Sequence, residues 1–122
     1  MRKISGLIGA LVLAIGMASC GGDSSGPTCP ANTFCLLATS FSPTSLSVPV
    51  GTTVTWQNMT TLHNVIWDDA AGAAAAGAGD GTGDMQNFSS PATHTRKFTT
   101  AGTFAFHCTF HAGMAATLVV TP

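Results

Sequence analysis

The sequence predicts an all-β protein of many short strands, folded as a two-sheet sandwich or a barrel. Three observations favour this fold class. Apolar and polar residues alternate with a period of two in several segments, and turns rich in glycine or proline separate these segments. Beyond the first twenty residues, no segment has the capped, amphipathic pattern of a helix. A chain of 122 residues has room for one hydrophobic core, so we expect a single folded domain.

The clearest alternation lies in the first half of the chain. Val54 and Trp56 alternate with threonines, so these two side chains are predicted to face the core. Leu46 and Val48 show the same pattern in the preceding segment, and residues 49–51, which include a proline and a glycine, supply the turn between the two strands.

Later segments share a bias toward β-branched and aromatic residues, which are favoured in strands. In one of them Phe104, Phe106 and Cys108 occupy alternate positions and therefore one face. The strands predicted in this half are 63–67, 94–98, 103–108 and 117–121.

Residues 70–83 depart from the pattern. They comprise seven alanines, five glycines, one aspartate and one threonine. Such a segment has little to bury and much backbone entropy to lose on folding, so we predict a mobile surface loop. Its alanine-rich part is able to form one or two helical turns.

The N-terminus has the features of an export signal. Arg2 and Lys3 precede an apolar run from residue 4 to residue 18, which is shorter than a membrane-spanning helix needs. The sequence Met17-Ala18-Ser19-Cys20 resembles the processing site of bacterial lipoproteins, in which the cysteine becomes the lipidated N-terminus. The alternative is an ordinary secretory signal that is cleaved nearby, with Cys20 left as an odd thiol or removed.

This interpretation divides the chain into a signal peptide (1–19), a flexible lipid-anchored tether (20–32) and a folded domain (33–122). It places the protein in the cell envelope or periplasm, attached to a membrane through the lipid on Cys20. Disulfides persist in that compartment, so Cys29 and Cys35 are either paired or present as two free thiols.

Charge excludes one class of function. Charged residues make up 7% of the chain, and without Arg2 and Lys3 two basic residues remain against five acidic ones, a formal net charge of −3. A nucleic-acid-binding protein needs a basic face to neutralise phosphates, and this chain cannot form one.

A candidate metal site lies near the C-terminus. Cys108, His111 and Met114 place a thiolate, an imidazole and a thioether within seven residues. His63 is the best candidate for a further ligand, because it shares strand parity with the core-facing Val65. A thioether is a poor ligand for zinc, whereas two histidines, a cysteine and a weak axial methionine form the sites of blue-copper electron-transfer proteins.

The chain from about residue 34 onward resembles a cupredoxin of the plastocyanin-like kind, with the short ligand loop of the amicyanin type. The resemblance implies a Greek-key β-sandwich of about eight strands with one copper ion near one end, held by His63, Cys108, His111 and Met114. It also implies that Asn64 hydrogen-bonds across to the Cys108 loop. The matching segments are Gly51–Asn58, His63–Val65, Ala101–Thr103 and Cys108–Met114.

A cupredoxin of this kind is expected to be a monomeric carrier of one electron, without catalysis of its own. Its partners would be exported or membrane-bound redox proteins such as cytochromes, oxidases or dehydrogenases. Phe110 and His111 form the candidate electron port. His107, next to Cys108, is either a second exit for the electron or an ordinary surface histidine. The alternative function is a copper-handling protein of the cell envelope without a role in electron transfer.

Overall fold

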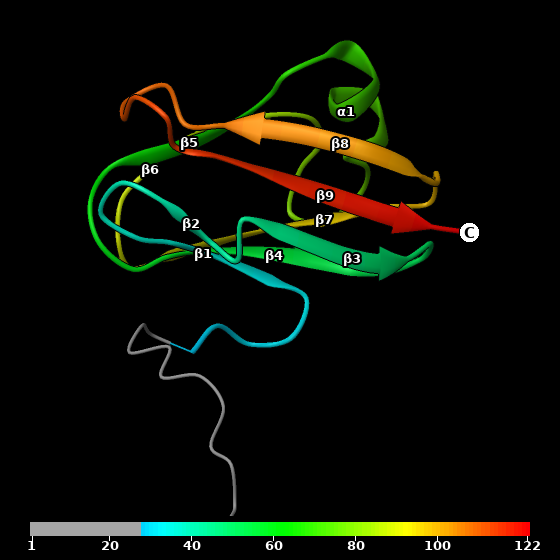
Figure 1. Ribbon diagram of the computed structural model, residues 1–122, viewed down its shortest axis with the longest axis horizontal. Coiled ribbons are helices and arrows are strands. Elements are labelled where there is room, and N and C mark those ends of the chain that lie inside the picture. The colour runs from blue at the N-terminus through cyan, green and yellow to red at the C-terminus, as the bar shows by residue number, and fades with distance from the viewer. Residues whose placement is uncertain (1–27) are drawn as a thin grey trace, which may run out of the picture.

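The computed structural model describes residues 28–122, and in it nine strands form two sheets that pack face to face (Figure 1). The predicted signal peptide and Cys20 lie outside the described residues. The strands are β1 (Thr33–Leu36), β2 (Phe41–Ser42), β3 (Ser45–Pro49), β4 (Thr53–Asn58), β5 (His63–Trp67), β6 (Met85–Phe88), β7 (Ala92–Lys97), β8 (Gly102–His107) and β9 (Ala115–Thr121). One short helix, α1 (Ala70–Ala75), interrupts them. The all-β sandwich is therefore confirmed, with one very short strand beyond the eight expected.

One sheet has the order β2-β1-β4-β7 and the other the order β3-β9-β8-β5-β6. The alternation seen in the sequence decides which side chains lie between them. Val54 and Trp56 of β4 are buried, as are Phe104 and Phe106 of β8, while their neighbours in each strand are more exposed. Phe106 contacts the ring of Trp56 edge-on, with centroids 5.7 Å apart, so aromatic side chains join the two sheets at the centre of the core.

The turn predicted at residues 49–51 is present, but it joins strands of different sheets. β3 pairs in parallel with β9, whereas β4 pairs in parallel with β1 and antiparallel with β7. Gly51 adopts a φ of +88°, a conformation that residues with a Cβ rarely adopt. The turn therefore carries the chain from one layer to the other.

Residues 70–84 form a strap that packs on the sandwich, and their alanine-rich part forms the helical turns that the sequence allows, as α1. Asp69 caps α1 by accepting a hydrogen bond from the Gly72 N–H at 2.8 Å. Gly72 lies on the ring of Trp67, so closely that an added Cβ would come within 3.0 Å of a ring carbon. α1 thus buries part of its surface against the end of β5.

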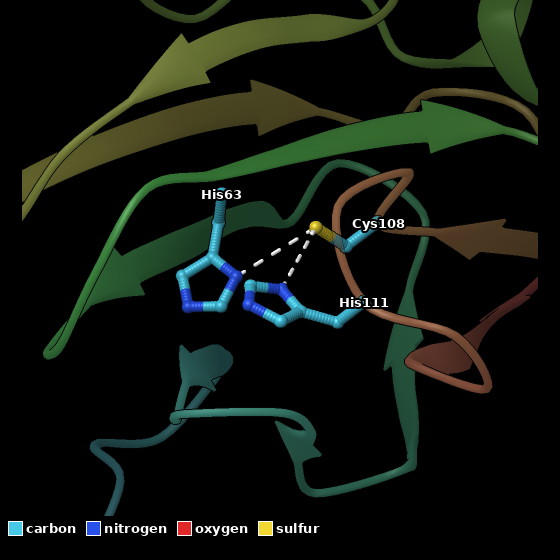
Figure 2. A group of neighbouring side chains, drawn as sticks. All are labelled: His63, Cys108 and His111. Atoms are coloured by element: carbon cyan, nitrogen blue, oxygen red, sulfur yellow. Dashed lines mark hydrogen bonds between the residues drawn. The ribbon is translucent and has the colours of Figure 1, made fainter.

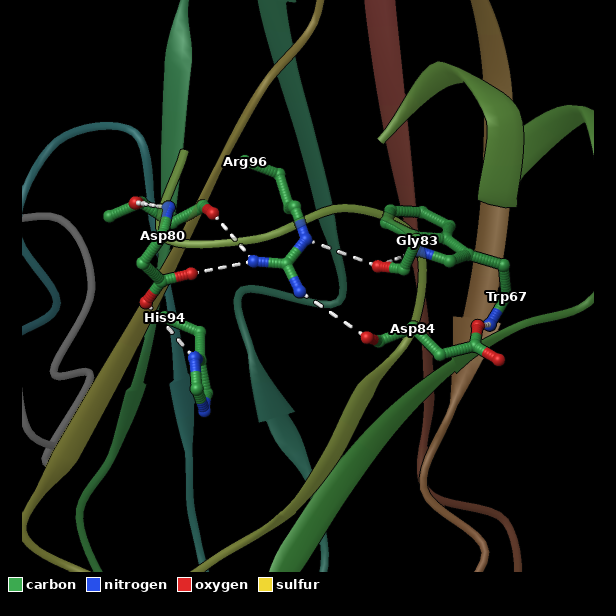
Figure 3. A network of polar contacts seen from close by, with 7 residues as sticks. Trp67, Asp80, Gly83, Asp84, His94 and Arg96 are labelled. Atoms are coloured by element: carbon green, nitrogen blue, oxygen red, sulfur yellow. Dashed lines mark hydrogen bonds and ion pairs between the residues drawn. The ribbon is translucent and has the colours of Figure 1, made fainter. Parts of the chain in front are cut away.

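Arg96 of β7 holds the other half of the strap (Figure 3). Its guanidinium donates to Asp80 Oδ1 at 2.6 Å, to the Gly83 carbonyl at 3.1 Å and to the Asp84 carbonyl at 3.3 Å, as well as to its neighbour's carbonyl, Thr95 O, at 2.8 Å. A buried guanidinium requires such partners, and it finds them in the strap. Backbone hydrogen bonds between the strap and Lys97 act together with this arginine, so β7 holds a segment whose apolar side chains are all small.

A disulfide joins Cys29 to Cys35 of β1, with Cα atoms 5.9 Å apart. It ties the chain that precedes the sandwich to a strand in the four-stranded sheet. Among the described residues Cys108 is then the free cysteine, and it is buried. Within residues 28–122, no helix is long and apolar enough to cross a membrane.

Candidate metal centre

Two segments that are distant in sequence meet at one end of the sandwich. His63 is the first residue of β5, and its side chain is fully buried, as its strand parity with Val65 predicts. Cys108 directly follows β8 and begins the loop 108–114 that leads into β9. Antiparallel pairing of β5 with β8 brings the start of one strand beside the end of the other.

The loop 108–114 is closed on itself by backbone hydrogen bonds. The Cys108 N–H donates to the Met114 carbonyl at 2.9 Å, and the Met114 N–H donates to the His111 carbonyl at 3.2 Å. Gly113 has a φ of +76°, which allows the sharp turn. A tight loop of this kind places the side chains of Cys108, His111 and Met114 around the same point, where Met114 is buried.

The side chains of His63, Cys108 and His111 converge on this point (Figure 2). Cys108 Sγ lies 3.7 Å from His63 Nδ1 and 3.7 Å from His111 Nδ1, and the three ligand atoms all lie within 4.8 Å of one another. Metal–sulfur and metal–nitrogen bonds of about 2.3 and 2.0 Å at an angle of about 110–120° would place sulfur and nitrogen about 3.5–3.7 Å apart, which both sulfur–nitrogen distances match. The three donor atoms are therefore close enough to bind one metal ion.

Asn64 connects the two ligand segments, in accordance with the expectation for this residue. Its Nδ2 donates to Thr109 Oγ1 at 2.8 Å, and its Oδ1 accepts from the Thr109 N–H at 2.9 Å. Because Asn64 follows His63 and Thr109 follows Cys108, these two bonds hold the candidate ligands at a set separation.

Burial lowers the pKa of His63, and the nearby His111 lowers it further, while a hydrogen bond to the Leu37 carbonyl acts in the opposite direction. The ring of His63 is therefore kept neutral at physiological pH. A neutral imidazole has the free lone pair that a metal ion needs.

The surface above the site is formed largely by the ligand loop. Residues 107–115 line a shallow depression there. Phe110 is 45% exposed and His111 is half-buried, so an apolar ring and a candidate ligand both reach solvent. His107 lies on the opposite face of its strand from the core-facing Phe106, and its Nδ1 pairs with Asp68 Oδ1 at 2.5 Å.

The sequence patterns do not mark two residues next to the site, Asn58 and Thr60, as functional. Asn58 is buried at the end of β4, and the Thr60 hydroxyl lies 3.2 Å from His63 Nε2. An asparagine just before a turn is a known signal for side-chain hydrogen bonding to the turn's backbone. Nothing in the order of residues, however, indicates that the threonine reaches back to the histidine.

Comparison with known proteins agrees with this geometry. Residues 37–121 match the family described as copper-binding proteins, plastocyanin/azurin family. The chain belongs to this family. Like other cupredoxins it takes copper as its cofactor, which fits the grouping of one sulfur and two nitrogens.

Individual relatives are similar over most of this cupredoxin domain. A plastocyanin from Scenedesmus fuscus is 33% identical over 84 residues, which cover 66% of this chain and 85% of that protein. Among solved structures, a proline-to-alanine variant of amicyanin in the oxidised state is 30% identical with a TM-score of 0.57, covering 74% of this chain and 81% of its own. A methionine-to-leucine variant of oxidised amicyanin reaches a TM-score of 0.59 at 27% identity, covering 79% of this chain and 87% of its own.

Proposed function

We propose that this cupredoxin carries single electrons through a blue-copper centre, with His63, Cys108 and His111 as the strong ligands and Met114 as the weak axial one. The observation that carries the proposal is the placement of Cys108 Sγ at 3.7 Å from the Nδ1 atoms of both histidines. A thiolate with two imidazoles and a thioether is the donor set of blue-copper electron-transfer sites.

The chain's own residues make the site suitable for rapid electron transfer. When bound, copper supplies the change between Cu(I) and Cu(II), and the protein limits how far the ligands move during it. His63 and Cys108 are buried, and Asn64 ties their segments together across 45 residues of sequence. A rigid ligand set of this kind keeps the reorganisation energy small. The thiolate of Cys108 also connects the site covalently to β8, which offers the electron a path through the strand.

Electron entry and exit would use the surface nearest the ligands. Phe110 and His111 are the proposed port, because an exposed apolar ring beside a candidate ligand suits a brief encounter with another redox protein. The proposed partners are exported or membrane-bound redox proteins such as cytochromes, oxidases or dehydrogenases, met by a monomeric carrier that has no catalysis of its own.

His107 offers a second exit, because it adjoins Cys108 in sequence and is partly exposed. Its replacement in His107→Ala should slow electron exchange with a partner while the visible spectrum stays the same. Stopped-flow kinetics with a small soluble cytochrome measure this. Unchanged rates would assign His107 to the surface only.

The location of the carrier is also a proposal. The apolar N-terminus and Cys20 support export and lipid attachment to a cell-envelope membrane, with residues 20–32 as the tether. Mass spectrometry of the mature protein should show an acylated N-terminal cysteine. A free N-terminus without acyl mass would leave an ordinary secretory signal as the explanation.

Visible and EPR spectroscopy of the Cu(II)-loaded protein test the electron-carrier function. An intense sulfur-to-copper band and reversible one-electron cycling are expected from the wild type. Cys108→Ser should abolish the band, whereas Ala112→Ser, an exposed change in the same loop, should leave it intact. A blue band that survives in Cys108→Ser would contradict the ligand assignment.

A copper-handling protein is the second candidate function. It predicts a weakly coloured site that loses copper rapidly to a competing chelator. The closed loop and the buried ligands favour slow release and therefore the carrier. Measuring the rate of copper transfer to a chelator separates the two.

A further inference from the structure

The turn between β4 and β5 is held by a single buried side chain. Asn58, 2% exposed, donates from Nδ2 to the Thr61 carbonyl at 2.6 Å and to the Phe88 carbonyl of β6 at 2.8 Å. Its Oδ1 accepts from the Thr60 N–H at 3.0 Å. One amide thus organises the turn internally and ties it to the neighbouring strand β6, so that the backbone of Thr60 has a set position.

This arrangement places the Thr60 hydroxyl at the far side of a candidate ligand. Thr60 Oγ1 lies 3.2 Å from His63 Nε2, while His63 Nδ1 faces Cys108 Sγ (Figure 2). An imidazole that offers the Nδ1 lone pair to a metal must carry its proton on Nε2, and that N–H requires an acceptor in a buried site. The Leu37 carbonyl also hydrogen-bonds to this ring. Thr60 is the side chain that can accept from Nε2.

We propose that Thr60, held in place by Asn58, is a positioning residue for His63. Its hydroxyl accepts the Nε2–H beside the Leu37 carbonyl, favours the tautomer with a free Nδ1 and restrains the rotation of the ring. His63 then lies between two side-chain braces: Asn64 connects its backbone segment to the Cys108 loop, and Thr60 holds its ring from the opposite end. The expected effect of Thr60 on the metal rests on the proposed role of His63 as a copper ligand. The expected effect of Thr60 on the tautomer of the His63 ring does not.

The chain offers a matched control in the next residue. Thr61 is exposed like Thr60 and lies in the same turn. Within residues 28–122 its hydroxyl makes no hydrogen bond to another residue, and only its carbonyl is used, by Asn58. The variants Thr60→Val and Thr61→Val therefore each remove one hydroxyl group from the same turn. Only Thr60→Val also removes a hydrogen bond to His63. Thr60→Ser keeps the hydroxyl and removes the methyl group.

The first measurement uses the metal-free protein. Ring ¹⁵N NMR of His63, recorded well above the ordinary histidine pKa, reports which nitrogen carries the proton. The wild type, Thr60→Ser and Thr61→Val should all show the Nε2–H tautomer with slow exchange of that proton. In Thr60→Val we expect exchange about tenfold faster, because a buried N–H without its side-chain acceptor is less protected. Urea unfolding of each variant checks that it is folded.

The second measurement uses the copper-loaded protein. A hydrogen-bonded Nε2–H makes the imidazole a stronger donor, and loss of such an outer partner costs about tenfold or more in metal affinity. If Thr60→Val weakens Cu(II) binding about tenfold relative to Cu(I), its reduction potential rises by about 59 mV for one electron. Thr60→Ser and Thr61→Val should keep the wild-type potential.

The two measurements separate this proposal from the carrier function. A tautomer or exchange change confined to Thr60→Val supports the positioning role, even if Cu(II) produces no thiolate band and the copper proposal fails. If Thr60→Val matches Thr61→Val in both measurements and its blue band is normal, the positioning role of Thr60 is overturned and the carrier function is not. Thr60→Ser that behaves like Thr60→Val also overturns it, because the methyl group and not the hydroxyl would then be responsible.

Discussion

The strap at residues 70–84 should depend on Arg96 for its place on the sandwich. Arg96→Met keeps a flexible apolar stem at a position that is 3% exposed and removes every hydrogen bond of the guanidinium. Three acceptors lie within 3.1 Å of it: Asp80 Oδ1, Thr95 O and Gly83 O. Asp80 is two-fifths exposed, so solvent screens its ion pair.

The expected loss follows from these contacts. With about 1 kcal/mol of net stabilisation for each of the three bonds, Arg96→Met should lower the free energy of unfolding by about 3 kcal/mol. For a urea m-value of about 1.5 kcal/mol/M, the midpoint should fall by about 2 M. Such a loss leaves a domain of ordinary stability folded, so it can be measured by urea unfolding of the metal-free protein.

Lys97→Met is the matched control. Lys97 is the next residue of the same strand, it is exposed, and its replacement removes the same charge. Its stability should stay within about 0.5 kcal/mol of the wild type. Limited proteolysis by a protease of broad specificity should cut the strap of Arg96→Met first. Equal stabilities for the two variants would refute the prediction that Arg96 holds the strap on the sandwich. A wild-type strap that is cut as readily as the strap of Arg96→Met would refute it as well.

Three further predictions concern neighbouring features. Gly79→Ala would place its Cβ 2.2 Å from the Thr95 carbonyl, so it should cost about 2 kcal/mol of stability by urea unfolding, and an unaltered midpoint would contradict this close approach. Asn64→Ala removes two hydrogen bonds and should cost about 1–2 kcal/mol and broaden the EPR signal of the Cu(II)-loaded protein, which a purely peripheral residue would not do. The metal-free protein should lose stability in two steps as pH falls, because the pKa values of both His63 and Asp80 are lowered in the folded state. The unfolded chain, with ordinary pKa values of 6.5 for His63 and 3.8 for Asp80, therefore takes up protons first. The loss begins about one pH unit above each of these values, so urea unfolding should show little loss from these groups above about pH 7.5.

The lowered pKa of Asp80 reflects the same cluster that holds the strap. Burial alone would raise this pKa, but hydrogen bonds from the Thr95 backbone, from His94 and from Arg96 lower it. His94 Nδ1 lies 3.0 Å from Asp80 Oδ2 (Figure 3). Asp80 therefore has two cationic or proton-donating neighbours on β7, and its acid form is disfavoured.

Features that depend on neighbours in the chain could be predicted from the sequence. The alternation around Trp56 and Phe106 determines which side chains are buried, because successive residues of any strand point to opposite faces. The same rule placed His63 in the core. The candidate ligand set also followed from the sequence, because the softness of a thiolate, an imidazole or a thioether is a property of the side chain itself.

Other features needed contacts between distant segments. The turn at residues 49–51 looks like a hairpin turn, but β3 and β4 lie in different sheets because each finds its partners elsewhere in the chain. The alanine- and glycine-rich strap is held by the guanidinium of Arg96 and by backbone hydrogen bonds to Lys97, both from a strand that follows it. The composition of this segment shows that it has few large side chains to bury. It does not show that a buried guanidinium elsewhere in the chain requires the segment's carbonyl groups as hydrogen-bond acceptors.

The sequence by itself determined the all-β class, the buried faces of the strands and the chemical identity of the four candidate ligands. Only the tertiary structure decided that Cys108 Sγ stands 3.7 Å from two Nδ1 atoms, and that Thr60 meets the far side of His63. The reason is physical: a ligand's chemistry belongs to its own side chain, whereas its position depends on strand pairing, loop closure and hydrogen bonds between residues far apart in the chain.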